Sequence, residues 1–113
     1  MDDCIFCKIA NKEIPTSLVY EDDLVAAFND LSPQAPVHVL IVPKKHYQSV
    51  LEVPEGDAIV AHMFHVASKL AKELGIAENG FRLVINTGKD GGQSVPPLHL
   101  HMTGGREHGW PAG

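Results

Sequence analysis

The chain has too few cysteines and too few basic residues for several classes of protein. Its 113 residues include only two cysteines, Cys4 and Cys7, which excludes a secreted disulfide framework. Nine Lys and Arg stand against fourteen Asp and Glu, and the net charge of -5 argues against general binding to nucleic acid or anionic membranes. The sequence also lacks the basic and apolar parts of a signal peptide, and it lacks an apolar run long enough to span a membrane. We therefore expect a cytoplasmic protein with no nucleic-acid or membrane partner, in which any phosphate site is local.

The residues that are present fit one α+β domain over residues 1–113, with a C-terminal tail from about 104–113. Apolar spacing predicts a short helix over 4–12 and an amphipathic helix over 55–74, with Gly75 as the C-cap of the second. His62 and His65 lie on the polar stripe of that helix, and we assign them no functional role. Strand-like runs cover 18–21, 24–28, 38–42, 81–86 and 98–103. Strands on both sides of one long helix predict a five-stranded antiparallel sheet with its helices on one face.

The run 38–42, HVLIV, is apolar at both alternating sets of positions except for His38. A strand whose two faces are both apolar is typical of the covered centre of a sheet. We therefore expect this strand to lie centrally, with His38 as its one polar side chain.

Two histidines near the C-terminus are the strongest candidates for chemistry. His99 and His101 are two residues apart in a predicted strand, so both point to one face, with their positions about 6.6 Å apart. Such a pair can be solvated strand histidines or metal ligands. The segment Gly91–Val95 just upstream favours a third interpretation, because its glycines, free amides and hydroxyl can cradle an anion. We predict phosphoryl chemistry, in which one neutral imidazole attacks while the other is held protonated against a phosphoryl oxygen.

A carboxylate in an earlier loop offers a candidate for sugar binding. Asp30 follows Phe28 closely, and an acid in a nucleoside site commonly accepts hydrogen bonds from ribose hydroxyls. The same residue can instead serve as an Asx-turn or capping residue. The local sequence leaves both interpretations open.

Several segments together resemble the histidine triad (HIT) family of nucleotide hydrolases and transferases, and its Hint branch in particular. The signature of the family is H-x-H-x-H followed by apolar residues. The matching segments run in order through the whole chain: Ile5-Phe6, Lys12–Pro15, Glu21–Asp23, Asp30–Pro36, Val42–His46, Gly92–Val95, Leu98–Met102, Gly104–Arg106 and Trp110-Pro111.

The resemblance implies a homodimer with a ten-stranded sheet that hydrolyses purine nucleoside 5'-phosphoramidates, as an adenosine 5'-monophosphoramidase does, with no metal required. His99 matches the nucleophile that forms a nucleotidyl-histidine intermediate. His101 and Ser94 match residues that contact the phosphate or leaving group, and His38 matches a histidine that supports the triad. The resemblance also implies a nucleotide-binding site made of Phe6, Ile9, Phe28, Asn29, Asp30, Leu31, Asn86, Gly92, Gln93, Ser94, Val95, His99, His101 and Trp110.

The sequence departs from this family in the motif itself, because Pro97 stands where the first triad histidine is expected. The triad is therefore a dyad, and we expect nucleotide binding to persist with reduced turnover. One alternative is a nucleotide-binding or partner-binding scaffold that has lost catalysis. A further alternative is a dinucleoside polyphosphate hydrolase.

The spacing Cys4-x-x-Cys7 raises the question of a zinc site. Some bacterial relatives resemble a four-ligand site made from such a pair, the histidine that matches His46 and the first triad histidine. Pro97 removes the fourth ligand, and structural zinc sites are normally closed. Cys4, Cys7 and His46 are therefore candidates for an incomplete zinc site, and two ordinary helix cysteines are the favoured interpretation.

Overall fold

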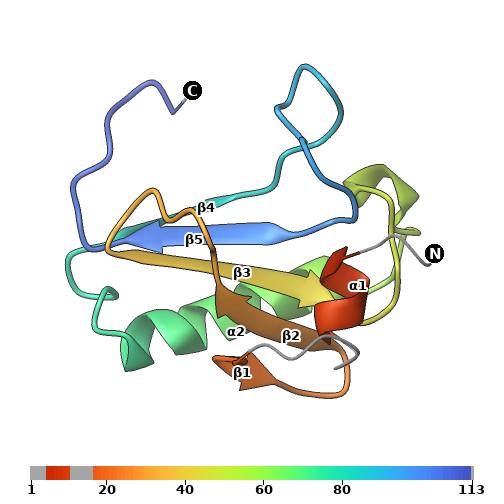
Figure 1. The fold of residues 1–113 in the computed structure, drawn as a ribbon, viewed down its shortest axis with the longest axis horizontal. Helices are drawn as coiled ribbons and strands as arrows, with labels where there is room; N and C mark the ends of the chain where they lie inside the picture. The colour runs from red at the N-terminus through yellow and green to blue at the C-terminus, as the bar shows by residue number, and fades with distance from the viewer. Residues whose placement is uncertain (1–4, 11–16, 113) are drawn as a thin grey trace.

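The computed structural model describes residues 5–10 and 17–112, which form a five-stranded sheet flanked by helices (Figure 1). In chain order the elements are α1 (Ile5–Ala10), β1 (Tyr20–Glu21), β2 (Val25–Asn29), β3 (Val37–Pro43), the 3-10 helix η1 (Val50–Glu52), α2 (Ile59–Glu73), β4 (Phe81–Val84) and β5 (Leu100–Gly104). The strand order is β1-β2-β3-β5-β4, and every neighbouring pair is antiparallel. The predicted fold class is confirmed, with shifts of a few residues at element ends.

The strand β3 lies at the centre of the sheet and is covered on both faces. It pairs with β2 on one side and with β5 on the other. Val39 and Ile41 belong to the core cluster that contains the buried side chains of α2, whereas Leu40 and Val42 belong to the cluster that contains α1. Alternate side chains of a strand point to opposite faces, so the all-apolar run reflects two separate layers of packing.

The long helix α2 covers one face of the sheet with a stripe of buried side chains. Ile59, Met63, Val66 and Leu70 recur at three- and four-residue spacing and are at most 5% exposed. Gly75 adopts a φ of 78°, and the next amide, that of Ile76, donates to Ala71 O at 3.0 Å, which closes the helix end as the sequence predicts. No helix in the described part of the chain is long and apolar enough to cross a membrane.

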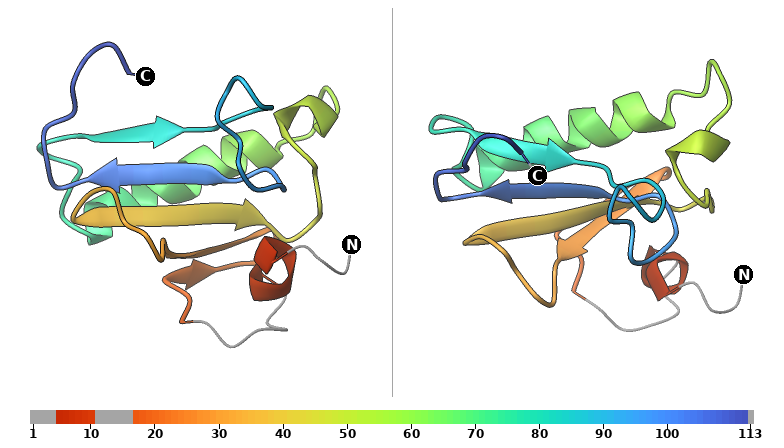
Figure 2. Two further views of the ribbon diagram at one scale, coloured as in Figure 1. Left: turned by 45° about the horizontal axis from the view of Figure 1, so that its top comes forward. Right: turned by 90° about the horizontal axis from the view of Figure 1, so that it is seen from above.

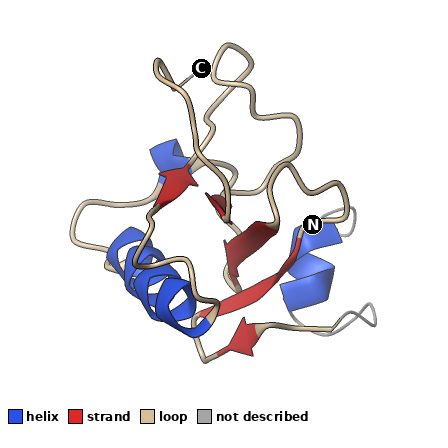
Figure 3. Cartoon of the chain, turned by 90° about the vertical axis from the view of Figure 1, so that its left-hand side faces the viewer, coloured by secondary structure: helices blue, strands red, loops and turns tan. Residues whose placement is uncertain are grey.

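The short helix α1 lies on the opposite face, so the expectation that the helices share one face is wrong (Figures 2 and 3). Its buried Ile9 packs with Phe28, Leu40 and Val42 from β2 and β3, and Phe6 packs against the same cluster. The physical reason lies in those strands, because their second apolar face needs a cover that α2 cannot supply. This placement brings Phe6 to the end of the sheet where β5 begins.

A polar clasp ties the turn between β1 and β2 to α2. The Asp22 carboxylate accepts hydrogen bonds from the Tyr20 hydroxyl and from the amides of Leu24 and Val25, and it lies 2.7 Å from Nε2 of His62. Burial raises the pKa of Asp22, but these hydrogen bonds outweigh burial and hold the pKa well below its ordinary value. His62, to which the sequence assigned no role, therefore has a structural contact.

Candidate active site

The two candidate histidines stand together where β5 begins. The ring centroids of His99 and His101 are 4.8 Å apart, and both side chains line a cavity of about 360 Å³. Leu98, Leu100 and Met102 alternate with them and are buried in the core under α2. The two imidazoles lie on the same side of the chain, as predicted, although β5 begins at Leu100 and His99 therefore stands just before the strand rather than within it.

The cavity gathers residues from segments that are far apart in the sequence. They come from α1, the loop after β2, the strand β3, the loop between β4 and β5, and β5 itself. The lining residues are Phe6, Asp30, Leu31, Ser32, Leu40, Asn86, Gly92, Ser94, Val95, His99 and His101.

Ser32 and Leu40 are the two lining residues that the sequence analysis missed. A usable signal exists for Leu40, because it lies two residues after His38 and shares its face of β3. Ser32 follows Asp30 in the loop, and its amide donates to Asp30 Oδ1 at 2.8 Å. The Asx-turn interpretation of Asp30 and its place in the cavity are therefore compatible.

Other predicted binding residues do not line this cavity. Ile9 and Phe28 are buried behind it, with the Phe28 ring centroid 5.8 Å from that of Phe6. Asn29 is exposed at the end of β2, and Trp110 is 87% exposed in the C-terminal segment. Gln93 lines a neighbouring hollow instead.

The predicted zinc ligands cannot be brought together in the same way. Cys4 and the side chain of Cys7 lie outside the described residues, and Nε2 of His46 lies 3.2 Å from Gln48 Oε1. The zinc site therefore stays a prediction.

The ring of His99 is held by the main chain. Its Nδ1 lies 2.8 Å from the carbonyl oxygen of Pro97. A carbonyl can only accept, so Nδ1 carries the proton and Nε2 keeps a free lone pair. The rings of Phe6 and His99 also pack nearly perpendicular to each other, with centroids 4.8 Å apart. Burial lowers the pKa of His99, which favours a neutral, nucleophilic imidazole at neutral pH.

A second chain of hydrogen bonds fixes the tautomer of His101. The amide of Gln34 donates to Nδ1 of His38 at 3.0 Å, so the proton of a neutral His38 is on Nε2. That Nε2 lies 2.9 Å from Nδ1 of His101 and donates to it. The proton of His101 is therefore on its Nε2, which becomes a donor on the side of the ring away from His38.

The structure corrects the expectation that one of the two imidazoles is held protonated. Burial, followed by the proximity of His99 and His38, lowers the pKa of His101 to about 4, and Asp30 opposes this only in part. With the pKa of His99 also lowered, both imidazoles are neutral at pH 7. His101 can thus stabilise a phosphoryl oxygen by donating a hydrogen bond rather than by carrying a full charge.

One set of donor atoms at the wall of the cavity has the composition of a metal site, with Asp30 and His101 in the lining and His38 behind them. One ligand atom each from Asp30, His38 and His101 lie within 4.8 Å of one another. A carboxylate with two imidazoles suits a borderline divalent ion such as zinc. Two contacts already hold these three side chains close together without an ion. They are the His38–His101 hydrogen bond and the 3.5 Å approach of Asp30 Oδ2 to His38 Nε2.

The glycine-rich loop is more closed than the sequence suggests. The amide of Gly92 donates to Lys89 O at 3.1 Å, and the amide of Gln93 donates to Gly88 O at 3.0 Å. Asn86 Nδ2 donates to Gly91 O at 2.7 Å. Because these donors are already hydrogen-bonded within the loop, the amides of Gly92 and Gln93 cannot bind an anion. Ser94 lines the cavity and remains a candidate for contact with a phosphate.

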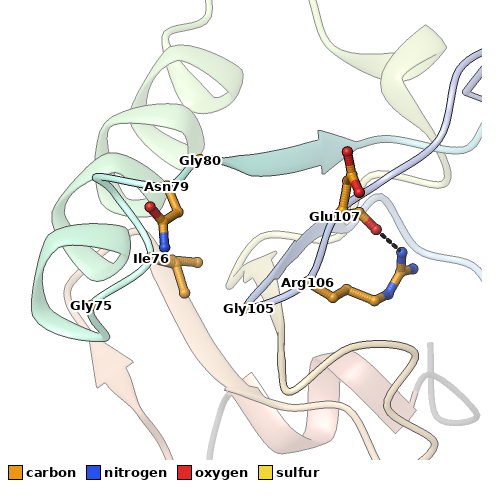
Figure 4. Close-up of a pocket in the computed structure, with 7 residues that line it drawn as sticks. All are labelled: Gly75, Ile76, Asn79, Gly80, Gly105, Arg106 and Glu107. Carbon is orange, nitrogen blue, oxygen red and sulfur yellow. Dashed lines mark hydrogen bonds between the residues drawn. The ribbon is translucent and has the colours of Figure 1, made fainter.

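A separate hollow of about 400 Å³ lies at the far end of β5, between the turn after α2 and the C-terminal segment (Figure 4). It is lined by Gly75, Ile76, Asn79, Gly80, Gly105, Arg106 and Glu107. Arg106 there donates to the main-chain oxygens of Gln34 and Glu107. The described lining of this hollow contains neither histidine nor cysteine, so we place the chemistry in the His99 cavity.

Comparisons with known proteins agree with this geometry. Residues 11–108 match the HIT domain. Over 109 residues the chain is 48% identical to the purine nucleoside phosphoramidase of Escherichia coli (strain K12). This match covers 96% of this chain and 92% of that protein. Over 113 residues the chain is 51% identical to an uncharacterised HIT-like protein of Synechocystis sp. This second match covers 99% of this chain and 98% of that protein.

Two solved structures have the same fold. A histidine triad protein from Clostridium difficile superposes with a TM-score of 0.93 at 54% identity, covering 96% of each chain. A HIT family hydrolase from Legionella pneumophila Philadelphia 1 superposes with a TM-score of 0.94 at 47% identity, covering 98% of this chain and 100% of that one.

Proposed function

The chain belongs to the HIT domain family, and from that premise we propose that it hydrolyses purine nucleoside 5'-phosphoramidates through a nucleotidyl intermediate on His99. The observation that carries this proposal is the 2.8 Å contact between His99 Nδ1 and the Pro97 carbonyl oxygen. It leaves the lone pair of Nε2 on a neutral ring that lines the cavity. A 48% identical relative that is a purine nucleoside phosphoramidase supports the substrate class.

The nucleotide is assigned to the cavity by the chemistry of its walls. Phe6, Leu31 and Val95 offer apolar surface for a purine ring, and Leu31 is 98% exposed and can be covered by a ligand. The Asp30 carboxylate supplies an acceptor for ribose hydroxyls. Ser94 and the imidazoles lie where the phosphate has to meet the nucleophile.

In the first step, the lone pair of His99 Nε2 forms a bond to phosphorus and the P–N bond to the amine breaks. The amine leaves with the bonding electron pair and takes a proton from solvent. The Nε2–H of His101 donates a hydrogen bond to a phosphoryl oxygen, on which negative charge grows in the transition state. In the second step, a water oxygen attacks phosphorus and the P–Nε2 bond breaks, with its electron pair returning to Nε2. The water gives up a proton to solvent, which balances the proton that the amine took up, and the nucleoside 5'-phosphate leaves with the neutral His99 restored.

Pro97 limits this scheme less than the loss of a triad histidine suggests. The acceptor for His99 belongs to the main chain, so proline supplies it as well as histidine would. Because position 97 carries no imidazole, the site lacks a group that could move protons near His99. We therefore propose reduced turnover. The scaffold alternative rests on the same residue, since a site that has lost the first triad histidine can still bind nucleotide without hydrolysing it at a useful rate.

We also propose a homodimer, because β4 lies at the edge of the sheet and, within residues 5–10 and 17–112, pairs with β5 on one side alone. An edge strand offers free amides and carbonyls to a second copy, and antiparallel pairing of two β4 strands gives a ten-stranded sheet with two-fold symmetry. Sedimentation at micromolar concentration is expected to show twice the mass of one chain. A species of single-chain mass throughout would refute the dimer.

The cytoplasmic location remains a prediction.

The test of the hydrolase proposal is turnover of a fluorogenic adenylyl-amine by the chelator-treated protein. Mass spectrometry of samples quenched at neutral pH is expected to show an adenylyl group on the peptide that contains His99. Turnover that stops on chelation would place a metal in the reaction. Binding of AMP with neither turnover nor adenylyl-protein would favour the scaffold.

A further inference from the structure

A second hollow adjoins the nucleotide cavity on the side of the loop between β4 and β5. This hollow, here called the Lys89 groove, has a volume of about 450 Å³. Its lining residues are Gln48, Gly88, Lys89, Gly92, Gln93, Ser94 and Pro96. Gly92 and Ser94 also line the nucleotide cavity, so the two spaces meet at these residues.

Two hydrogen bonds of the Gln93 side chain fix one wall of the groove in the absence of a ligand. Its Nε2 donates to Gln48 O at 2.9 Å, and its Oε1 accepts from the amide of Gly88 at 3.0 Å. Three segments of the chain are thereby joined: the loop after β3, the start of the glycine-rich loop and the approach to β5. Both polar atoms of the Gln93 side-chain amide are hydrogen-bonded to main chain. We therefore treat Gln93 as a residue that positions the groove and not as a ligand of the nucleotide.

The charge of the groove has one sign. Lys89 is the single charged residue among the described residues that line it, and its neighbour Asp90 does not contribute to the lining. The other polar groups of the lining are the side chains of Gln48, Gln93 and Ser94. A groove with one exposed cation and uncharged polar walls suits a ligand with one negative charge.

We propose that the Lys89 groove is the subsite for the leaving amine, and that it favours amines whose chain carries a carboxylate. This inference rests on the proposed phosphoramidase function. With the nucleoside in the first cavity and phosphorus between His99 and Ser94, the P–N bond continues past Ser94 into the groove. The carboxylate takes no part in bond breaking, so the reaction keeps the balance described above and gains only binding to Lys89.

A polyphosphate leaving group fits the groove less well. The second half of a dinucleoside polyphosphate carries several negative charges and a second nucleoside. One lysine balances one of those charges, and the chain as a whole carries a net charge of -5. The charge count therefore favours a singly charged amine.

The experiment uses two substrates that differ in one charge. Adenosine 5'-phosphoramidates of 4-aminobutyrate and of 4-aminobutanamide have the same length, and only the first carries a carboxylate. We expect kcat/KM to be about threefold to fivefold higher for the carboxylate, the size of a solvent-exposed ion pair, and we expect the difference to shrink in 1 M salt. In Lys89→Met the ratio falls to about one, and in Lys89→Glu it inverts.

The matched control is Lys72→Met, which removes an exposed lysine on α2 and is expected to leave the ratio unchanged. Because each ratio compares two substrates in one protein, a loss of folded protein cancels. Equal kcat/KM values in the parent chain, or a preference that survives Lys89→Met, would overturn the groove assignment.

Failure of the proposed function gives a different result, namely that neither substrate is hydrolysed. The same pair is then compared by Kd in the His99→Asn variant, where the groove still predicts tighter binding of the carboxylate. Equal Kd values there would overturn the groove independently of the hydrolase proposal.

Discussion

His99 and Pro97 are joined by a hydrogen bond from a side chain to the main chain, with 2.8 Å between Nδ1 and the carbonyl oxygen. Every residue has a carbonyl, so this contact tolerates a change of side chain at position 97. The family motif expects an imidazole there, and its loss leaves the orientation and tautomer of His99 in place. Orientation of the proposed nucleophile and proton movement around it are thus separate properties of this site.

Replacement of His99 by asparagine is expected to lower kcat by roughly 10⁴-fold or more, because it removes the nucleophile. Binding of AMP should persist, since His99 contributes to the reaction more than to ground-state affinity. The measurements are turnover of an adenylyl-amine and calorimetric titration with AMP. His65→Asn, an exposed position on α2, is the control and should behave as the parent chain. Turnover equal to that of the parent would reject His99 as the nucleophile.

The pH dependence of kcat/KM is expected to follow the lowered pKa of His99. Burial disfavours the charged ring, so the neutral, attacking form persists below the ordinary histidine pKa of about 6.5. The acid limb of kcat/KM for the free protein should therefore bend below pH 6.5 and be flat above it until another group titrates. A stopped-flow profile between pH 4 and 8 measures this limb. A bend at or above pH 6.5 would contradict a neutral, buried nucleophile.

Much of the site could be predicted because it depends on local periodicity. The alternation of Leu98, His99, Leu100 and His101 already separates a core face from an active face, and the structure confirms it. The doubly apolar run of β3 likewise reveals a covered central strand without any knowledge of its neighbours.

Other features depend on contacts between distant segments, which no local pattern contains. The periodicity of α1 shows that it has an apolar side but not which face of the sheet that side covers. The neutral state of His101 depends on burial and on His38, which is 63 residues away in the sequence. Asp22 and His62 meet across 40 residues, and each alone is typical of a solvated surface residue.

The Asp22–His62 clasp predicts a stability difference between two helix histidines. His62→Ala removes a hydrogen bond to a charged, half-buried carboxylate, and we expect it to lower the free energy of unfolding by about 1–3 kcal/mol. His65→Ala, which is exposed on the same helix, should change it by less than about 0.5 kcal/mol. Urea unfolding at pH 7 measures both variants.

The same clasp has a defined pH dependence. The pKa of Asp22 is lowered by folding, so its contribution to the free energy of unfolding is complete above the ordinary aspartate pKa of about 4 and is lost as the pH falls from there through the lowered pKa of the folded state. The difference in free energy of unfolding between Asp22→Asn and the parent chain should therefore narrow below pH 4. A difference that is the same at pH 3 and pH 7 would show that the clasp does not depend on the Asp22 charge.

Restoring the imidazole with Pro97→His separates the hydrolase from the scaffold. If the missing group moves protons near His99, kcat should rise by roughly 10² to 10⁴, the contribution of one positioned acid-base group, with little change in AMP affinity. The new imidazole would also complete the predicted set of Cys4, Cys7 and His46, so the zinc content should rise in parallel. Turnover, AMP affinity and metal content are measured on the same preparation.

Pro97→Ala is the matched control, because it keeps the carbonyl acceptor of His99 and adds no imidazole. Pro97 is buried, so any packing change at this position affects both variants, whereas only the histidine variant can gain a proton-transfer group. A rate that rises equally in both would assign the defect to the fixed φ of proline at the approach to β5. Turnover that stays undetectable in Pro97→His, with the fold and AMP affinity intact, would place the defect elsewhere and make the nucleotide-binding scaffold the better interpretation.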